Sequence, residues 1–292
     1  MWGDTYLGMN SMFKSVLVSM RPYQWYKNLV IFIGIVFSGN LFNLGILQYS
    51  IFAFIFFVFI SGAIYIINDI KDVEMDRLHP QKRFRPIAVG TLSARTALLF
   101  AFILLSISLT TSFLVDRSLC YIGLLYIFVN FLYTFYLKNI ALIDIMMVAV
   151  GFVLRAIAGC FIISVWVSPW LILCVLLMAF VLAFGKRRHE LLTTSSNTRS
   201  CLSQYTENMV DSLLNISVAM LLMSYALYSF NVDAYMMITL PFAFYGAFRF
   251  VQLVYEKNFG GEAELILKDR ASLANLVLWT VSVIWIIYEV NV

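Results

Sequence analysis

Three aspartates follow an asparagine where a long apolar segment ends: Asn68, Asp69, Asp72 and Asp76. Their spacing of one, three and four residues places the carboxylates along one face of a helix. Like charges on one face repel each other unless a hard cation lies among them, and Mg²⁺ is commonly held by carboxylates together with substrate phosphate oxygens. The spacing therefore predicts that Asp69, Asp72 and Asp76 are catalytic residues that bind Mg²⁺ for chemistry on a polyphosphate.

The same stretch also has a simpler interpretation. Residues 68–86 contain four acids and five bases, and charges of this kind can mark the end of a membrane span as a solvated loop. Acids at a membrane edge are costly, however, and are usually functional. We therefore favour the metal-binding interpretation.

Basic side chains in two charged stretches are candidates for binding a phosphorylated substrate. They are Lys82, Arg83 and Arg85 in the first stretch, and Lys186 and Arg187, followed by the acid Glu190, in a second stretch at 185–194. For the second stretch an alternative stays open, because membrane topology alone requires basic residues just past a span.

One arginine, Arg155, falls within a predicted span. Asp144 precedes it by eleven residues, close to three helical turns, so both lie on one face with Arg155 ~16 Å further along the axis. An arginine at this depth must face protein or water. It either pairs with a buried acid or backbone carbonyls, or binds a phosphate at the bottom of a cavity, a task that suits the guanidinium group. Asp144 is equally suited to capping its helix.

Three tyrosines recur where the inward-facing ends of helices are expected to converge: Tyr65, Tyr126 and Tyr133. They are candidates for lining a pocket, and Tyr133 is the strongest because Lys138 follows it into the same loop. The four cysteines have no metal-ligand spacing and the two histidines are isolated. Neither residue type predicts a metal site.

The composition places these residues in a membrane protein. The 292 residues are 62% hydrophobic and 12% charged, with a mean hydropathy of +0.88, against about 25% charged residues in soluble domains. Charge-free runs are long enough for helical spans of ~20 residues and lack the alternation of a β-barrel. The expected fold is one all-α domain, residues 1–292, with about nine spans around a central cavity. The spans are 29–47, 50–68, 94–114, 118–136, 141–162, 168–185, 211–230, 234–254 and 272–290.

The distribution of Lys and Arg predicts the orientation. If the first span runs outward, nearly all bases outside the spans lie on one side, and Arg117 alone lies opposite, which makes the first side cytoplasmic. The amino terminus is then inside and the carboxyl terminus outside an inner, multi-pass membrane location. Residues 1–27 read as an amphipathic lead-in, and 69–93, 186–208 and 255–271 as cytoplasmic loops. The net charge of +4 reflects this bias and does not indicate nucleic-acid binding.

The motif resembles that of the UbiA-type superfamily of intramembrane prenyltransferases, NDxxDxxxD, at every defined position. Several further segments resemble the decaprenyl-phosphate phosphoribosyltransferase branch. They are RPYQWYKN at 21–28, which includes Lys27 and Asn28, HPQKRFRPIAVG at 79–90, YTFYLKN at 133–139, IDIMMVAVGFVLRAIAG at 143–159 and KRRHEL at 186–191. The resemblance implies Mg²⁺-dependent transfer of 5-phosphoribose from phosphoribosyl diphosphate to a polyprenyl phosphate, with Asn28, Asn68 and Tyr133 among the residues that bind substrate. Two bound anions repel each other, and Lys27, Lys138 or Arg155 could offset that repulsion.

One departure from the superfamily separates the remaining alternatives. Classical aromatic prenyltransferases carry a second aspartate-rich motif between the sixth and seventh spans, where this sequence offers Glu190 and no DxxxD. The resemblance then implies a single Mg²⁺-diphosphate centre with the lipid as acceptor. The alternatives are an aromatic or haem prenyltransferase that uses a polyprenyl diphosphate, and a transporter, although no repeated interruption of the spans indicates the latter.

Overall fold

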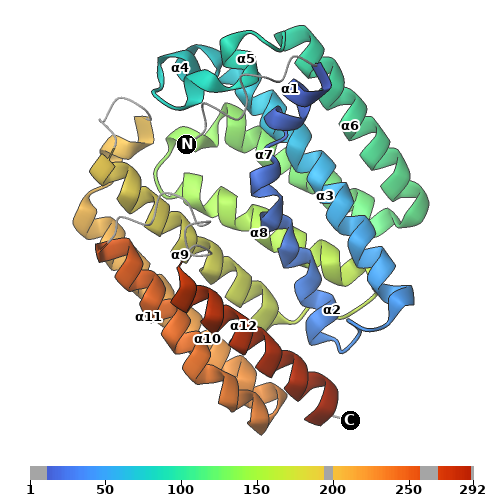
Figure 1. The fold of residues 1–292 in the computed structure, drawn as a ribbon, viewed down its shortest axis with the longest axis vertical. Coiled ribbons are helices and arrows are strands. Elements are labelled where there is room, and N and C mark those ends of the chain that lie inside the picture. The colour runs from blue at the N-terminus through green and yellow to red at the C-terminus, as the bar shows by residue number, and fades with distance from the viewer. Residues whose placement is uncertain (1–11, 194–199, 257–268, 291–292) are drawn as a thin grey trace.

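The computed structural model describes residues 12–193, 200–256 and 269–290, and these residues form helices and connecting turns without a strand. Figure 1 shows the long helices packed side by side in one bundle. The expected all-α membrane architecture is confirmed. The undescribed segments 1–11, 194–199 and 257–268 contain parts of the predicted lead-in and of two predicted loops.

Eight helices of the described residues are long and apolar enough to cross a membrane. Each of them begins within six residues of the start of a predicted span. They are α3 (Leu44–Lys71), α6 (Ala94–Val115), α7 (Arg117–Phe135), α8 (Ile143–Ile162), α9 (Pro169–Thr193), α10 (Glu207–Val232), α11 (Leu240–Glu256) preceded by the 3₁₀ helix η5 (Ala234–Thr239), and α12 (Arg270–Trp285) continued by the π-helical turn η8 (Ile286–Val290).

The first predicted span, 29–47, takes a different form. The chain forms a 3₁₀ helix, η1 (Pro22–Phe32), and a short α-helix, α2 (Ile33–Phe37), and then turns before α3 begins. A 3₁₀ helix rises ~2.0 Å per residue, against 1.5 Å in an α-helix, so η1 and α2 together reach ~30 Å. This is about the thickness of the hydrocarbon core of a bilayer. The segment thus traverses the bundle with fewer residues than a regular span needs.

Short helices gather at one end of the bundle, where the sequence predicted the cytoplasmic loop 69–93. These are α1 (Met12–Ser19), α4 (Val73–Leu78), η2 (Lys82–Phe84) and α5 (Pro86–Val89). In Figure 1 this end lies opposite the carboxyl-terminal end of α12. Two further 3₁₀ turns are η3 (Leu137–Asn139), between α7 and α8, and η4 (Ser200–Gln204), before α10.

Polar residues fix where the long helices begin. Asn43, Ser93, Asp116, Thr206 and Asp269 each accept a hydrogen bond from a backbone N–H of the first turn that follows. Such N-caps satisfy donors that a helix cannot satisfy itself, and replacing one by alanine costs about 1 kcal/mol. The boundaries seen from the sequence therefore have a local cause.

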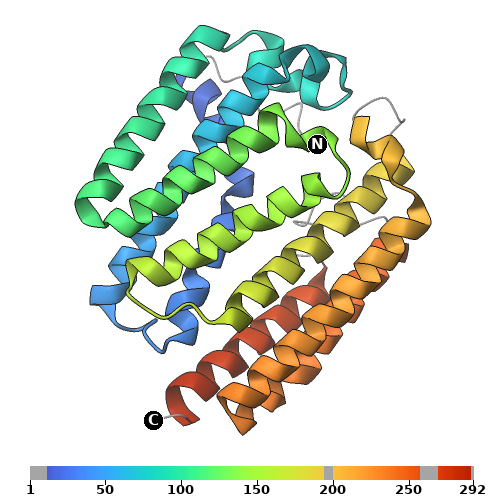
Figure 2. The ribbon, with the colours of Figure 1, turned by 180° about the vertical axis from the view of Figure 1, so that it is seen from behind.

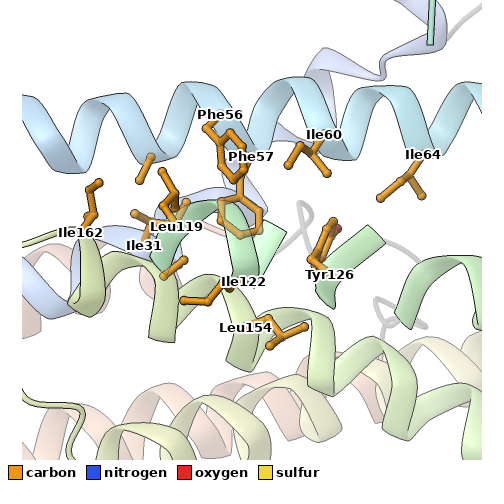
Figure 3. Packing of buried hydrophobic residues seen from close by; sticks show 12 residues of the cluster. Ile31, Phe56, Phe57, Ile60, Ile64, Leu119, Ile122, Tyr126, Leu154 and Ile162 are labelled. Carbon is orange, nitrogen blue, oxygen red and sulfur yellow. The ribbon is translucent and has the colours of Figure 1, made fainter. Parts of the chain in front are cut away.

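The bundle packs in the order of the sequence from α6 to α10, and Figure 2 shows α7, α8 and α9 as neighbours. The largest core cluster joins η1, α3, α7 and α8, and Figure 3 shows Phe57 of α3 pointing towards Ile122 and Tyr126 of α7. The carboxyl-terminal turn η8 packs near the amino-terminal part of the fold. The Tyr288 hydroxyl accepts a 2.7 Å hydrogen bond from the backbone N–H of Leu41. This contact joins η8 to the turn between α2 and α3.

A close approach of two backbones positions η1 against α8. A Cβ atom on Gly159 would lie only 2.1 Å from the carbonyl oxygen of Ile31. No other residue type fits at that distance, because the helix backbone itself would have to move. Gly159 thus brings the η1 segment, including Asn28, onto the face of α8 that carries Arg155.

Candidate active site

Two of the three predicted aspartates converge on one guanidinium group. Asp69, in the last turn of α3, and Asp76, on α4, both accept hydrogen bonds from Nη1 of Arg85, at 3.0 and 2.6 Å. Asp69 also binds Arg21. The carboxylates of Asp69 and Asp76 are only 2% and 5% exposed. A buried carboxylate requires compensation of this kind, since burial of an unpaired charge is strongly unfavourable.

The third aspartate points to a different base. α3 ends at Lys71, and Asp72 forms the junction to α4. The Asp72 carboxylate binds Nζ of Lys138, which lies in η3. The expectation that all three carboxylates share one face of one helix is therefore wrong, because α3 ends before Asp72 and Asp76 lies on α4. Asp69 and Asp76 nevertheless meet at Arg85. We use the name aspartate cluster for Asp69, Asp72 and Asp76 with Arg21, Arg85 and Lys138.

Arg21 is the site residue that sequence reasoning missed. Its backbone is left-handed, with φ of 54°, and its guanidinium lies over the ring of Tyr65 as well as on Asp69. Burial has the largest single effect on the pKa of Arg21 and lowers it, but Asp69, Tyr23 and Tyr65 together raise this pKa overall. A non-glycine residue in this conformation costs about 1–3 kcal/mol and such strain clusters at functional sites. The sequence feature that could have identified Arg21 as a site residue is its position at the start of the RPYQWYKN segment.

The donor set of the aspartate cluster fits a small hard cation. Among the described residues no three His, Cys, Asp or Glu side chains are grouped to hold a metal ion. However, Mg²⁺ is usually bound through one or two carboxylates, with the remaining positions filled by water and substrate phosphates. Asp69 and Asp76, which meet at one nitrogen atom, provide such a pair of oxygen donors.

The other predicted ligands near this cluster lie at different depths. Lys82 and Asn68 are partly buried, whereas Arg83 is exposed and lies over the ring of Phe84. Lys27 is partly buried in η1 and donates to Gln24. The structure thus gathers Arg85 and Lys138 directly on the aspartates, and it leaves Arg83 at the surface of the same end.

The second predicted stretch forms another buried cluster. Arg187 binds Asp144 of α8 and Glu190 of its own helix, and the Tyr205 hydroxyl donates to Asp144 at 2.7 Å. We use the name Arg187 cluster for Arg187, Asp144, Glu190 and Tyr205. Burial, and then the hydrogen bond to Asp144, raises the pKa of Tyr205, so this hydroxyl stays a donor at neutral pH. Asp144 thus links helices instead of capping its own.

The stretch from Lys186 to Glu190 is helical, and the prediction that it begins a loop at 186 is wrong. α9 continues to Thr193. The loop was inferred from charge, but Lys, Arg and Glu are good helix formers and the ion pair between Arg187 and Glu190, three residues apart, supports the helix. The next arginine, Arg188, which sequence reasoning did not single out, binds both Glu207 and Asp211 of α10.

The corner between α7 and α8 connects the two clusters. Lys138 in this corner binds Asp72, while Tyr133, four residues before η3, lies close enough to Arg187 for an electrostatic interaction. Tyr205 also contacts this corner, because its hydroxyl accepts a 2.6 Å hydrogen bond from the backbone N–H of Leu142. The structure therefore brings together residues from α3, α7, α8 and α9 that the sequence only placed on one side of the membrane.

Arg155 lies deeper in the bundle than the aspartate cluster, and it forms no ion pair with an acid of either cluster. It is 5% exposed and donates to the side chain of Asn28, the hydroxyl of Tyr126 and the carbonyl oxygen of Gly151. Its place on the same face as Asp144 does not lead to a pair, since Asp144 binds Arg187 instead. We use the name Arg155 site for Arg155, Asn28 and Tyr126.

Two shallow, open pockets of the described structure lie away from the aspartate cluster. One, of about 490 Å³, borders Ser118 and Trp166, and another, of about 470 Å³, borders Phe242 and Asn275. Neither is lined by a residue of the aspartate cluster. A central cavity open to the cytoplasm therefore stays a prediction, and the ion pairs are what the structure shows at that end.

Relatives of known sequence share most of the chain. A decaprenyl-phosphate phosphoribosyltransferase of Corynebacterium glutamicum is 32% identical over 94% of this chain and 86% of its own length. The protein of the same name from Mycolicibacterium smegmatis is 34% identical over 75% of this chain and 71% of its own length.

Solved structures share the fold at lower identity. A UbiA homologue from Archaeoglobus fulgidus bound to DMAPP and Mg²⁺ has a TM-score of 0.74 at 18% identity, covering 94% of this chain and 99% of the homologue. The same homologue bound to GPP and Mg²⁺ has a TM-score of 0.72 at 17% identity, with the same coverage. The model of the UbiA prenyltransferase family matches residues 28–276, so the chain is a multi-pass membrane enzyme that belongs to this family.

Proposed function

We propose that the protein transfers 5-phosphoribose from phosphoribosyl diphosphate to a polyprenyl phosphate, with Mg²⁺, and releases pyrophosphate. The observation that carries the proposal is the aspartate cluster, in which two buried carboxylates and a partly exposed third pair with three bases at one end of an apolar bundle. The similarity to two decaprenyl-phosphate phosphoribosyltransferases over most of the chain supports this choice of donor and acceptor.

The proposed reaction is a displacement at the anomeric carbon of the donor. An oxygen of the lipid phosphate forms a bond to C1 as the bond from C1 to the diphosphate oxygen breaks, and pyrophosphate carries away the electron pair. The lipid phosphate is already an anion, so no strong general base is needed. The main demand on the protein is stabilisation of charge on the leaving diphosphate.

The residues of the aspartate cluster meet this demand together. Asp69 and Asp76 would hold Mg²⁺, with Asp72 next to them, and the bound cation would neutralise the leaving group. If a bound cation compensated these carboxylates, Arg85, Arg21 and Lys138 would be available to bind diphosphate oxygens. Such an exchange of partners would keep the buried charges compensated both in the substrate-free site and in the site that holds the cation and the diphosphate.

The remaining predicted ligands surround this centre in the proposal. Asn68, Lys82, Arg83 and Lys27 would contact the donor from its cytoplasmic side, and Tyr133 and Lys186 from the side of α7 and α9. Arg187 already binds two carboxylates, so a phosphate must displace Glu190 to reach it.

The proposed location follows from the solubility of the two substrates. The donor is a polar anion that arrives from the cytoplasm, whereas the acceptor carries an apolar tail that remains among the helices. An inner-membrane enzyme with its amino terminus inside and its carboxyl terminus outside would present the aspartate cluster to the cytoplasm.

One observation favours a second candidate, a transferase that uses a prenyl diphosphate. Glu207 and Asp211 lie one helical turn apart at the start of α10, and the homologue from Archaeoglobus fulgidus was solved with prenyl diphosphates and Mg²⁺. Both carboxylates bind Arg188, however, so each already has a partner within the fold and one of the two negative charges is compensated.

One assay separates the two candidates. The full chain, purified in detergent, is given Mg²⁺ with either labelled phosphoribosyl diphosphate and a polyprenyl phosphate, or a polyprenyl diphosphate and 4-hydroxybenzoate. We expect lipid-linked phosphoribose and pyrophosphate in the first mixture only, and no product after addition of EDTA. A prenylated aromatic acid would instead establish the second candidate.

A further inference from the structure

The Arg155 site contains a buried positive charge that no acid compensates within the described structure. Arg155 is 5% exposed, and its three hydrogen bonds, of 2.6 to 2.9 Å, end on an amide oxygen, a phenol oxygen and a carbonyl oxygen. No ion pair of the described residues includes Arg155. Charged side chains within a membrane protein normally find a partner or serve a ligand.

A second buried group at the same place lacks a partner. The Asn28 side chain is 1% exposed, and while its oxygen accepts from Arg155, its Nδ2 atom has no hydrogen-bond partner. Leaving a buried amide donor unsatisfied costs about 1–3 kcal/mol. The guanidinium group has five N–H donors, of which the structure occupies three. Unused donors of Arg155 and Asn28 therefore lie together.

The donors of the Arg155 site are held rigidly. The rings of Tyr126 and Phe152 lie 4.8 and 5.5 Å from the guanidinium carbon, and the close contact at Gly159 fixes η1 against α8 one turn beyond Arg155. Preorganised donors in a site of low dielectric bind an anion without the cost of reordering the protein.

A path of aromatic and basic groups joins this site to the aspartate cluster. Tyr126 interacts with Tyr65, and Tyr65 lies under the guanidinium group of Arg21, which binds Asp69. Asn28 follows Arg21 by seven residues of the 3₁₀ segment, so the Arg155 site lies ~14 Å deeper. The two sites are thus neighbours at different depths of one bundle.

We propose that the Arg155 site binds a phosphate monoester dianion, separate from the diphosphate that the aspartate cluster takes. This inference rests on the proposed function, whose two substrates each carry one phosphate monoester: the 5-phosphate of the donor and the phosphate of the lipid acceptor. The chemistry that the site recognises is the same for both. A planar guanidinium group and an amide suit the tetrahedral oxygens of such a group.

The first test measures binding directly, with the probes ribose 5-phosphate and a short-chain polyprenyl phosphate. Titration calorimetry on the full chain in detergent compares the wild type with Arg155→Lys, which keeps the charge but loses the planar fork. We expect affinity for one probe to fall about tenfold or more, and affinity for the other to change little. The probe that is affected identifies the source of the phosphate. Arg117→Lys, an exposed arginine at the other end of the bundle, is the matched control and should bind both probes as the wild type does.

The second test uses Asn28→Asp, which places a carboxylate beside Arg155. The new ion pair compensates the buried guanidinium group, so the melting temperature should stay or rise, while the new negative charge repels the phosphate and binding of the affected probe should fall at least about tenfold. If Arg155 has only a structural role, Asn28→Asp should have the same effect on the melting temperature but leave the affinity for both probes unchanged. Unchanged affinity of both probes in both variants would therefore overturn the proposal.

Kinetics distinguishes this inference from the proposed function. If the wild type forms lipid-linked phosphoribose and Arg155→Lys changes neither KM, the function stands and the phosphate site is wrong. If the wild type forms no such product but binds ribose 5-phosphate in an Arg155-dependent way, the site stands and the proposed reaction is wrong.

Discussion

The aspartate cluster and the Arg187 cluster use the same residue types in different proportions. In the aspartate cluster one arginine, Arg85, is shared by two carboxylates, one of which also binds Arg21, and the basic side chains are 12–22% exposed. In the Arg187 cluster one arginine, 7% exposed, is enclosed by two carboxylates and lies beside Tyr205. The first arrangement leaves its bases in reach of water, and the second does not.

This difference separates a site that can exchange partners from one that fixes helices. A base that reaches water can leave its carboxylate when a cation or a phosphate arrives, because solvent screens the intermediate state. Asp144 is fully buried and joins α8 to α9 through Arg187, so breaking this pair leaves an uncompensated charge. The two clusters share the α7–α8 corner, and we infer that the Arg187 cluster holds that corner while the aspartate cluster acts on substrate.

The largest expected effect is on turnover. Asp69→Asn should lower kcat/KM on the order of 100-fold or more, because the amide cannot hold a cation, while Arg21 and Arg85 keep a hydrogen-bond acceptor and the fold survives. Transfer of labelled phosphoribose and the melting temperature in detergent are the measurements. Glu74→Gln, an exposed acid in the same segment, is the control and should retain activity. Full activity of Asp69→Asn at saturating Mg²⁺ would remove this residue from the metal site.

The next effect is on stability in the other cluster. Arg187→Met should lower the free energy of unfolding by about 3–5 kcal/mol, because Asp144 is left buried without its cation. Adding Asp144→Leu should restore most of that loss. Chemical unfolding of both variants in detergent measures the coupling. If the single variant keeps its stability but raises the KM for the donor, Arg187 is a substrate ligand and the division between the clusters is wrong.

A smaller effect concerns Tyr205. Tyr205→Phe removes the hydroxyl that donates to Asp144 and accepts from Leu142, at a cost of about 1–3 kcal/mol. Because the pKa of Tyr205 is raised in the fold, its contribution is fully present below the unfolded value near 10 and is lost as the pH rises through the folded value. Stability curves of wild type and variant should therefore converge only above about pH 10. Convergence at neutral pH would contradict the buried hydrogen bond.

The smallest effect is expected at Lys138. The pair between Lys138 and Asp72 has side chains 22% and 26% exposed, and pairs that reach solvent contribute about 0–1 kcal/mol. Lys138→Gln should therefore hardly change the melting temperature, while it raises the KM for the donor several-fold through the loss of a charge. If Lys138→Gln lowered the free energy of unfolding as much as Arg187→Met does, the ion pairs of the two clusters would contribute equally to stability, and the distinction between the clusters would be wrong.

Local chemistry explains why the spans were predictable. A charge-free run of about twenty apolar residues has one low-energy solution in a bilayer, and residues such as Ser93 and Asp116 cap the helices that follow. The aspartate motif was readable for the same reason, since its spacing is a property of one chain segment. The position of η1 was not readable from its own segment, because η1 packs against α8 through the close contact between Gly159 and Ile31.

The partners of the charged residues were decided only by the tertiary structure. The sequence identified Asp69, Asp144, Arg155 and Arg187 as unusual because a charge in an apolar segment is costly wherever it goes. Whether Asp144 meets Arg155 or Arg187, and whether Asp72 shares a base with Asp69, depends on which helices pack together and on the end of α3 just before Asp72. These contacts join residues 43 to 127 positions apart, and spacing along one helix says nothing about them.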